Sequence, residues 1–216
     1  MDSGTRCGKK GAVNQSAEHW NERYRETESV WSLEPNQFVV EYLSGLPTGS
    51  MVDIAGGEGR NALWFASRGW TVENSDFSKV AVDKFRERAS RAGVLDRCVG
   101  TVSSALESQA CQTGPVDLAV IAYLQLAPAE LAEAITVTAA HLKPGATFFG
   151  VWHERDNVGR GLGGPQTPEL NPTVDELVAD GRSAGLTIEV CELRERLVTR
   201  DDVTGTAIDV VLVGSR

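Results

Sequence analysis

The chain has 216 residues, a length typical of a single domain. Hydrophobic residues make up 41% of it, and 22 residues are glycine, so the composition excludes a largely disordered protein. The formal net charge is −9, and no basic stripe offsets it, so we expect no nucleic-acid partner. No apolar run approaches the ~20 residues that span a bilayer, and residues 1–16 lack the apolar segment of a secretion signal. We therefore expect a cytoplasmic protein with no membrane association.

The coarse organisation is a short tail followed by one domain. Residues 1–16 are polar and are expected to form a flexible tail, with a single domain over residues 17–216. Residues 17–46 are expected to form a helical lid segment, with one helix over 17–28 and a second that opens at Pro35, because proline is tolerated in the first helical turn. The four cysteines and three histidines lack the spacing of a zinc site, so no metal is expected.

Beyond the lid segment, short apolar runs alternate with amphipathic ones. The expected strands are 51–55, 71–76, 97–102, 116–124, 146–152, 186–198 and 205–215. Helices are expected between the first five strands, and a capping box at Thr173–Glu176 begins the last helix. The last two strands are separated by a short polar turn, which favours an antiparallel hairpin. The pattern predicts an α/β fold, a Rossmann-like, doubly wound, seven-stranded sheet that is mostly parallel.

A glycine-rich loop, VDIAGGEGRNA at residues 52–62, lies between the first strand and the next helix. Ligands of open α/β sheets bind at the carboxyl ends of the strands, and Gly57 and Gly59 lack a Cβ that would keep a ligand away. The spacing from Gly57 to Ala62, with Asp76 downstream, also fits a dinucleotide site. The carboxylate of Asp53 would oppose a pyrophosphate and suits a ligand with an ammonium group and no phosphate. S-adenosylmethionine is such a ligand.

Residues 17–216 resemble the class I S-adenosylmethionine-dependent methyltransferases. VDIAGGEGRNALWFASRGW matches the first motif of that family, NSDFS the acid of the second strand, VDLAVIAYLQL the fourth strand and HLKPGATFF the turn before the fifth. GEGRNA, with HWNERY and W…EPN upstream, is most similar to the bacterial tellurite-resistance and thiopurine-type enzymes, and AYLQL and GGPQTPEL resemble enzymes that methylate heterocyclic or quinone-like compounds. The resemblance implies transfer of a methyl group to a heterocyclic nitrogen, a hydroxyl or quinol, or a thiol of a small molecule, in detoxification, with S-adenosylhomocysteine as product.

The resemblance also implies a set of cofactor-binding residues. These are Asp53, Ala55, Gly56, Gly57, Gly59, Asn61, Asp76, Phe77, Ser103 and Ala122. Asp76 is expected to accept hydrogen bonds from both ribose hydroxyls. Two positions depart from the family pattern: Ala55 replaces the usual first glycine, and the usual acid after the third strand is not evident. Ser103 or Ser104 is therefore expected to take its place beside the adenine.

Methyl transfer requires a base only when the accepting atom carries a proton. His153 ends the fifth strand and is the best candidate for a general base, since the ordinary pKa of histidine is ~6.5. Tyr123 follows the fourth strand and is expected to orient the acceptor. The aromatic side chains of Trp20, Tyr24 and Trp31 either form a lid over the cofactor and acceptor or dock their segment on the domain.

Two other functions remain open from the sequence. An NAD-dependent oxidoreductase is disfavoured by Asp53 and by the lack of sequence for a second, nicotinamide-side domain. A methyltransferase-like protein that binds the cofactor without turnover is compatible with Ala55 and with the missing acid. The protein is expected to be a monomer or a homodimer.

Overall fold

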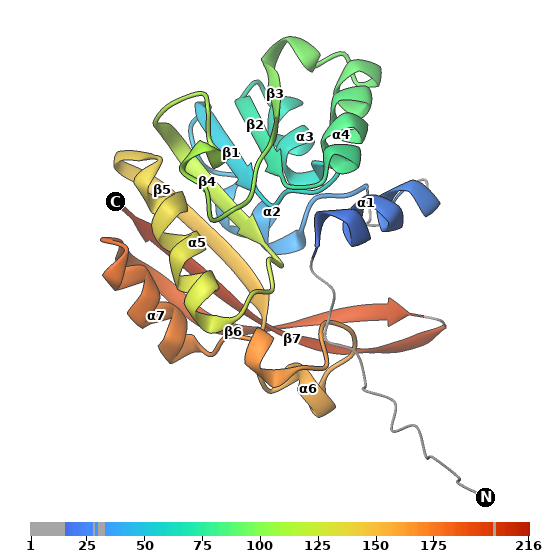
Figure 1. The fold of residues 1–216 in the computed structure, drawn as a ribbon. Coiled ribbons are helices and arrows are strands. Elements are labelled where there is room, and N and C mark those ends of the chain that lie inside the picture. Colours follow the sequence, from blue (N-terminus) through green and yellow to red (C-terminus); the bar gives the residue numbers. More distant parts are fainter. Residues whose placement is uncertain (1–15, 28, 30–32, 201) are drawn as a thin grey trace, which may run out of the picture.

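The structure is a computed structural model that describes residues 16–27, 29, 33–200 and 202–216. Trp31 and residues 1–15 of the expected tail lie outside the described residues. Seven strands form one sheet in the order β3-β2-β1-β4-β5-β7-β6 (Figure 1). Their bounds are β1 Ser50–Ile54, β2 Thr71–Asp76, β3 Cys98–Val102, β4 Val116–Ala122, β5 Leu142–His153, β6 Thr187–Arg200 and β7 Val203–Ser215.

The pairing of the strands is parallel from β1 to β5 and antiparallel at the end. β1 pairs with β2 and β4, β2 with β3, and β4 with β5, all in parallel. β7 pairs antiparallel with both β5 and β6. The predicted seven-stranded, mostly parallel sheet with an antiparallel C-terminal hairpin is therefore confirmed.

Helices cover both faces of this sheet. The α-helices of the described residues are α1 (Ala17–Glu26), α2 (Gln37–Leu43), α3 (Arg60–Ala66), α4 (Lys79–Arg91), α5 (Pro128–Ala140), α6 (Asn157–Arg160) and α7 (Val174–Ser183). One apolar cluster packs α2, α3 and α4 against one face through Phe38, Phe65 and Phe85. A second cluster packs α5 and α7 against the other face, with Ile135 and Leu177 at its centre. Because β1 to β5 run parallel, their carboxyl ends all lie at one edge of the sheet.

Some element boundaries differ from the sequence expectations. α2 begins at Gln37 and not at Pro35, because the side chain of Asn36 caps it by accepting the N–H of Phe38 at 2.8 Å. Residues 143–145, expected as a turn after α5, lie inside β5, where an irregular register against β4 accommodates them. The capping box of α7 is present as predicted, with both Thr173 and Glu176 hydrogen-bonded.

The two helices of the N-terminal segment are docked on the domain. Asn21 of α1 accepts hydrogen bonds from the Ser78 hydroxyl at 2.7 Å and the Val80 N–H at 3.2 Å, at the start of α4. Tyr24 is buried, and α2 is part of the core. These contacts support the docking interpretation of Tyr24, and closure over a ligand stays a prediction. No helix in the described ranges is long and apolar enough to cross a membrane.

Candidate functional site

The loop after β1 adopts a tight left-handed path. Ala55, Gly57 and Gly59 all have positive φ, at 54°, 57° and 77°. A left-handed conformation costs a residue with a Cβ roughly 1–2 kcal/mol, which gives a physical reason why glycine is usual at the position of Ala55. The turn brings the start of α3 back over the carboxyl end of β1.

Asp53 lies beneath this loop as a fully buried carboxyl. No well-aligned hydrogen bond reaches either of its oxygens within the described residues. Burial raises its pKa to about 7, and the charge of Arg60, the backbone N–H of Ala62 and the side chain of Asn61 oppose this rise only in part. A buried polar group without a partner is costly, so the site is suited to a ligand that offers a hydrogen-bond donor or a cation. The ammonium end of S-adenosylmethionine fits this requirement.

Asp76 ends the neighbouring strand and shapes the same loop. Its two oxygens accept the backbone N–H groups of Gly57 at 2.9 Å and Ser78 at 2.8 Å. Burial raises its pKa to about 6, although these two hydrogen bonds favour the ionised form. Each oxygen keeps a second lone pair, so ribose hydroxyls remain acceptable partners. The sequence did not indicate a role for Asn74. Its side-chain amide donates to the carbonyl of Gly57 at 2.9 Å and holds the loop against β2.

Two residues of the loop have structural contacts that the sequence did not indicate. A Cβ on Gly59 would lie 2.2 Å from the ring of Phe85, so glycine is required there for packing α3 on α4 as well as for its positive φ. The expectation that its missing Cβ also serves the approach of a ligand stays a prediction. Asn61 is buried and accepts the N–H of Asn36 at 2.9 Å, which ties α2 to α3.

The loop after β3 carries an acid, Glu107, whose role the sequence did not indicate. The Ser103 hydroxyl donates to Oε2 of Glu107 at 2.9 Å, and the N–H of Ser104 approaches the same oxygen at 3.3 Å. The backbone N–H of Ser103 also donates to the carbonyl of Asp76 at 3.2 Å. A carboxylate therefore stands beside the predicted adenine contact, four residues after Ser103 in the chain. Phe77 and Ala122 are half-buried near the same edge.

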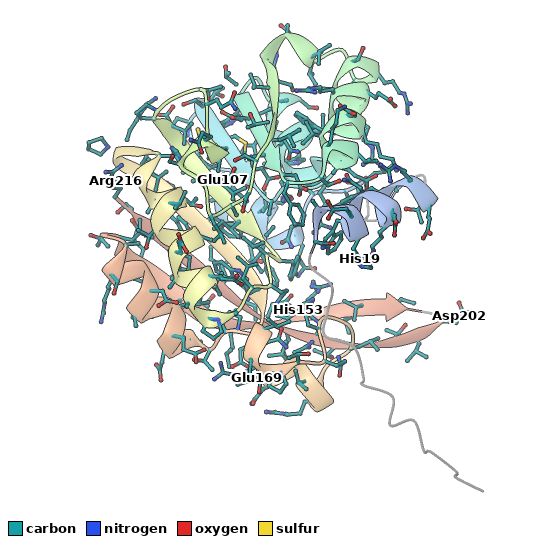
Figure 2. All side chains as sticks on the ribbon, in the orientation of Figure 1. His19, Glu107, His153, Glu169, Asp202 and Arg216 are labelled. Carbon is teal, nitrogen blue, oxygen red and sulfur yellow. The ribbon has the colours of Figure 1, made fainter. Side chains whose placement is uncertain are left out.

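The two predicted catalytic side chains, His153 and Tyr123, lie together. Their rings are 4.8 Å apart between centroids and inclined by 31°. Both meet Asp209 of β7: Nδ1 of His153 lies 2.9 Å from Oδ1, and the Tyr123 hydroxyl donates to Oδ2 at 2.9 Å. Nε of Arg196 on β6 donates to Oδ2 at 2.8 Å. His153 lies where the end of β5 meets the hairpin and the α6 region (Figure 2).

Burial and charge act in opposite directions on this cluster. Burial alone would raise the pKa of Asp209, but its contacts with His153 and Arg196 outweigh burial and hold the pKa below its ordinary value. Burial, reinforced by the negative charge of Asp209, raises the pKa of the Tyr123 hydroxyl. Asp209 is therefore an anion and Tyr123 a neutral donor at neutral pH.

Backbone features at the cluster are unusual as well. Tyr123 has φ of 60°, a left-handed conformation that few residues other than glycine adopt. Its N–H donates to the carbonyl of Val151 at 2.8 Å, which fixes it against β5. A Cβ on Gly164 would lie 2.5 Å from Cδ2 of His153, so the loop after α6 packs directly on the histidine ring.

Trp20 and Tyr24 belong to a different part of the edge. Their rings are 5.7 Å apart on α1, and Tyr24 is buried against the domain. Across the described ranges, no group of three or more His, Cys, Asp or Glu side chains is placed to hold a metal ion.

Comparisons with known proteins agree with this geometry. Residues 51–145 match the family model of a methyltransferase domain. The chain superposes on a structure from work on the conversion of a disulfide bond into a thioacetal group during echinomycin biosynthesis, with a TM-score of 0.74 and 21% identity, covering 93% of this chain and 91% of that chain. TehB from Haemophilus influenzae superposes with a TM-score of 0.69 and 14% identity, covering 93% of this chain and 66% of that chain. A search of curated proteins found no match.

A third similar structure holds a ligand. Magnesium protoporphyrin IX methyltransferase from Synechocystis PCC 6803, solved with bound SAH, gives a TM-score of 0.61 and 12% identity, covering 93% of this chain and 83% of that chain. The sheet topology is the Rossmann-like fold that these methyltransferase structures share. Residues 51–145 match a methyltransferase domain, which confirms the resemblance at that level. The tellurite-resistance and thiopurine-type subgroup stays a prediction.

Proposed function

We propose that the protein transfers a methyl group from S-adenosylmethionine to a small-molecule acceptor. The observation that carries this proposal is the buried carboxyl of Asp53 beneath the glycine loop, which no well-aligned hydrogen bond reaches within the described residues, with Asp76 at the end of the adjacent strand. A ligand with an ammonium group and two ribose hydroxyls satisfies both acids at once. A pyrophosphate would bring negative charge to a site that already holds two carboxyls, which disfavours the NAD-dependent alternative.

The proposed cofactor contacts follow the edge of the sheet. Asp53 binds the ammonium group, and the backbone from Ala55 to Asn61 surrounds the amino-acid end. Asp76 binds the ribose. Phe77 and Ala122 flank the adenine, and Ser103 with Glu107 takes the adenine amino group as a hydrogen-bond donor. When bound, S-adenosylmethionine supplies an electrophilic methyl group on a sulfonium.

The contribution of the protein is positional and acid–base. Holding the reacting atoms in line and excluding water is worth up to ~7–11 kcal/mol in such reactions. His153 is the proposed general base, and the Tyr123 hydroxyl orients the acceptor. Proposed acceptors are small molecules with a heterocyclic nitrogen, a hydroxyl or quinol, or a thiol, and the subgroup resemblance suggests a role in detoxification.

A calorimetric titration of the purified protein with S-adenosylmethionine, S-adenosylhomocysteine and NAD tests the cofactor. We expect binding of the first two and none of NAD. The Asp53→Asn variant should bind S-adenosylmethionine more weakly, while Asp83→Asn, which changes an exposed acid of α4, should bind it normally. Binding of NAD alone would overturn the proposal. Cofactor binding without transfer to any acceptor would favour the non-catalytic alternative.

A further inference from the structure

We propose that Asp209 is a positioning residue that holds His153 as a general base and Arg196 as a cation against one acceptor group, and that this group is therefore a hydroxyl. The inference rests on the proposed function and narrows it. Of the two acceptor types that must lose a proton, the hydroxyl and the thiol, it selects the hydroxyl, which gives up its proton less readily (pKa about 10 for a phenol against about 8.5 for a thiol) and so depends more on a base and a cation.

The pairing of His153 with Asp209 fixes which ring nitrogen carries a proton. The two residues are register partners on β5 and β7, so the backbone itself places their side chains together. Nδ1 lies 2.9 Å from the fully buried Oδ1. An unprotonated Nδ1 would direct its lone pair at an anionic oxygen, so the proton belongs on Nδ1. A neutral imidazole carries one N–H, which leaves Nε2 free to accept a proton.

The surroundings of His153 hold this arrangement in place. Its ring packs on Tyr123, whose hydroxyl is bonded to the same carboxylate. The backbone at Gly164 touches the ring and leaves no room for a Cβ. Nδ1 and Oδ1 are buried, and their 2.9 Å contact is an electrostatic one that lacks the alignment of a hydrogen bond, whereas Nε2 is not among the buried side-chain atoms of the described residues that lack a partner. The ring is therefore anchored at Nδ1 and keeps Nε2 available at the carboxyl edge of the sheet.

The second partner of Asp209 is the cation. Nε of Arg196 binds Oδ2, and the Tyr123 side chain is a second polar neighbour of the guanidinium. A guanidinium has five N–H donors, so the terminal ones remain for a ligand. The guanidinium carbon lies 5.5 Å from the centre of the Tyr123 ring, so the cation, His153 and Tyr123 belong to one cluster. A fixed cation stabilises negative charge that develops on an oxygen.

The chemistry of this pair is a single proton transfer. The acceptor O–H bond breaks, its proton passes to Nε2, and its electron pair stays on the oxygen, which becomes the nucleophile beside Arg196. The imidazolium that results faces the Asp209 carboxylate, and it returns its proton to solvent after the transfer. A pyridine-type nitrogen already has a free lone pair and needs neither a base nor a cation. An ion pair that served only to anchor the hairpin would need no histidine.

Nitrogen-15 NMR of histidine-labelled protein tests the tautomer without donor or acceptor. We expect the neutral His153 ring to carry its proton on Nδ1, with its signal assigned by its loss in His153→Gln. Asp209→Asn should move the proton, in whole or in part, to Nε2, because the amide NH₂ can donate to Nδ1. Asp117→Asn is the matched control, since Asp117 pairs with Lys143 at 2.8 Å elsewhere on the sheet. A wild-type His153 ring protonated on Nε2 would overturn the proposal, whether or not Asp209→Asn folds.

A second measurement tests the acceptor class. With S-adenosylmethionine bound, 2-naphthol and hydroquinone should be methylated and quinoline should not. Asp209→Asn should reduce turnover by roughly 100-fold or more while cofactor affinity stays unchanged, the usual range for losing a general base. Transfer to quinoline, or to none of the hydroxyl compounds in protein that binds the cofactor, would refute the inference. Failure to bind S-adenosylmethionine at all would instead refute the proposed function, whatever the NMR result.

Discussion

Asp53 and Asn74 are register partners on β1 and β2, and both of their side chains lie under the backbone of Gly56. A Cβ at Gly56 would come within 2.2 Å of Oδ1 of Asn74 and 2.9 Å of Cγ of Asp53. The N–H of Gly56 also donates to the carbonyl of Ser75 at 3.0 Å, so the backbone is fixed in this close approach. The loop and the two polar side chains below it are therefore one unit.

Gly56→Ala should disrupt this unit. The added methyl group has no space between the loop and Asn74, so the loop must shift away from β2. We expect the affinity for S-adenosylhomocysteine to fall by tenfold or more, which corresponds to ~1.4 kcal/mol, about one strong interaction. The melting temperature of the variant should also be lower. Calorimetry and thermal unfolding measure the two effects. Gly45→Ala is the control, because a Cβ there meets nothing within 4 Å. Equal behaviour of the two variants would contradict the close packing.

The raised pKa of Asp53 should make the stability of the protein depend on pH. Its folded-state pKa of about 7 lies above its ordinary value of 3.8, so the native state holds the proton more tightly than the unfolded state does. The free energy of unfolding should therefore fall as pH rises from about 4 to about 7. Asp53→Asn removes this titration, so the free energy of unfolding of the variant should rise relative to that of the wild type over that range. The change is at most ~4 kcal/mol, from ~1.4 kcal/mol per pKa unit. A pH-independent difference between the two proteins, measured by urea unfolding, would show that Asp53 is not so perturbed.

Ligand binding should show the opposite trend at the same carboxyl. A ligand ammonium group favours the ionised form, so binding of S-adenosylhomocysteine below pH 7 should release a proton, and its affinity should increase with pH, by at most tenfold per unit. Methylthioadenosine lacks the amino-acid end and is the control, because it keeps the ribose contact to Asp76. Titrations in two buffers of different ionisation enthalpy count the protons. Equal pH dependence for both ligands would assign the effect to Asp76 instead.

The elements around the loop could be predicted because their signals are local. A five-residue apolar strand, a glycine turn and a following helix are contiguous, and Asp53 and Asp76 stand at fixed offsets within that pattern. The capping box of α7 is equally local. Pro35 misled the prediction of α2, because the next residue, Asn36, is the better cap.

The rest of the site depends on contacts between distant parts of the chain. Asp209 and Arg196 face His153 only because β7 inserts between β5 and β6, an order that alternation of elements does not specify. Glu107 was missed for a different reason. The irregular loop after β3 turns it back onto Ser103, four residues away, and no periodic pattern marks such a turn.

Asp76→Ala should weaken cofactor binding by ~1.5–3 kcal/mol, the range for losing hydrogen bonds to a charged group. Part of this loss is indirect, since Asp76 also accepts the N–H groups of Gly57 and Ser78. A 2′,3′-dideoxy analogue of S-adenosylhomocysteine separates the two effects, because it lacks the hydroxyls that Asp76 would bind. The variant should lose affinity for S-adenosylhomocysteine and lose much less for the analogue. Equal losses for both ligands, measured by calorimetry, would leave Asp76 a role in shaping the loop alone.

Glu107 should determine which purine the site accepts. Its Oε2 lies at the end of β3 beside Ser103 and can accept a hydrogen bond from an exocyclic amino group. S-inosylhomocysteine carries a carbonyl oxygen at that place, which would face the carboxylate with no donor between them. We expect the wild type to bind S-adenosylhomocysteine about tenfold or more tightly than the inosyl compound, consistent with ~1–3 kcal/mol for an unsatisfied acceptor.

Glu107→Gln should reduce this preference, because an amide offers a donor to the carbonyl. Glu87→Gln, at an exposed position of α4, is the control. If Glu107→Gln keeps the full preference, another group binds the adenine, and the hydrogen bond from Ser103 serves only to close the loop.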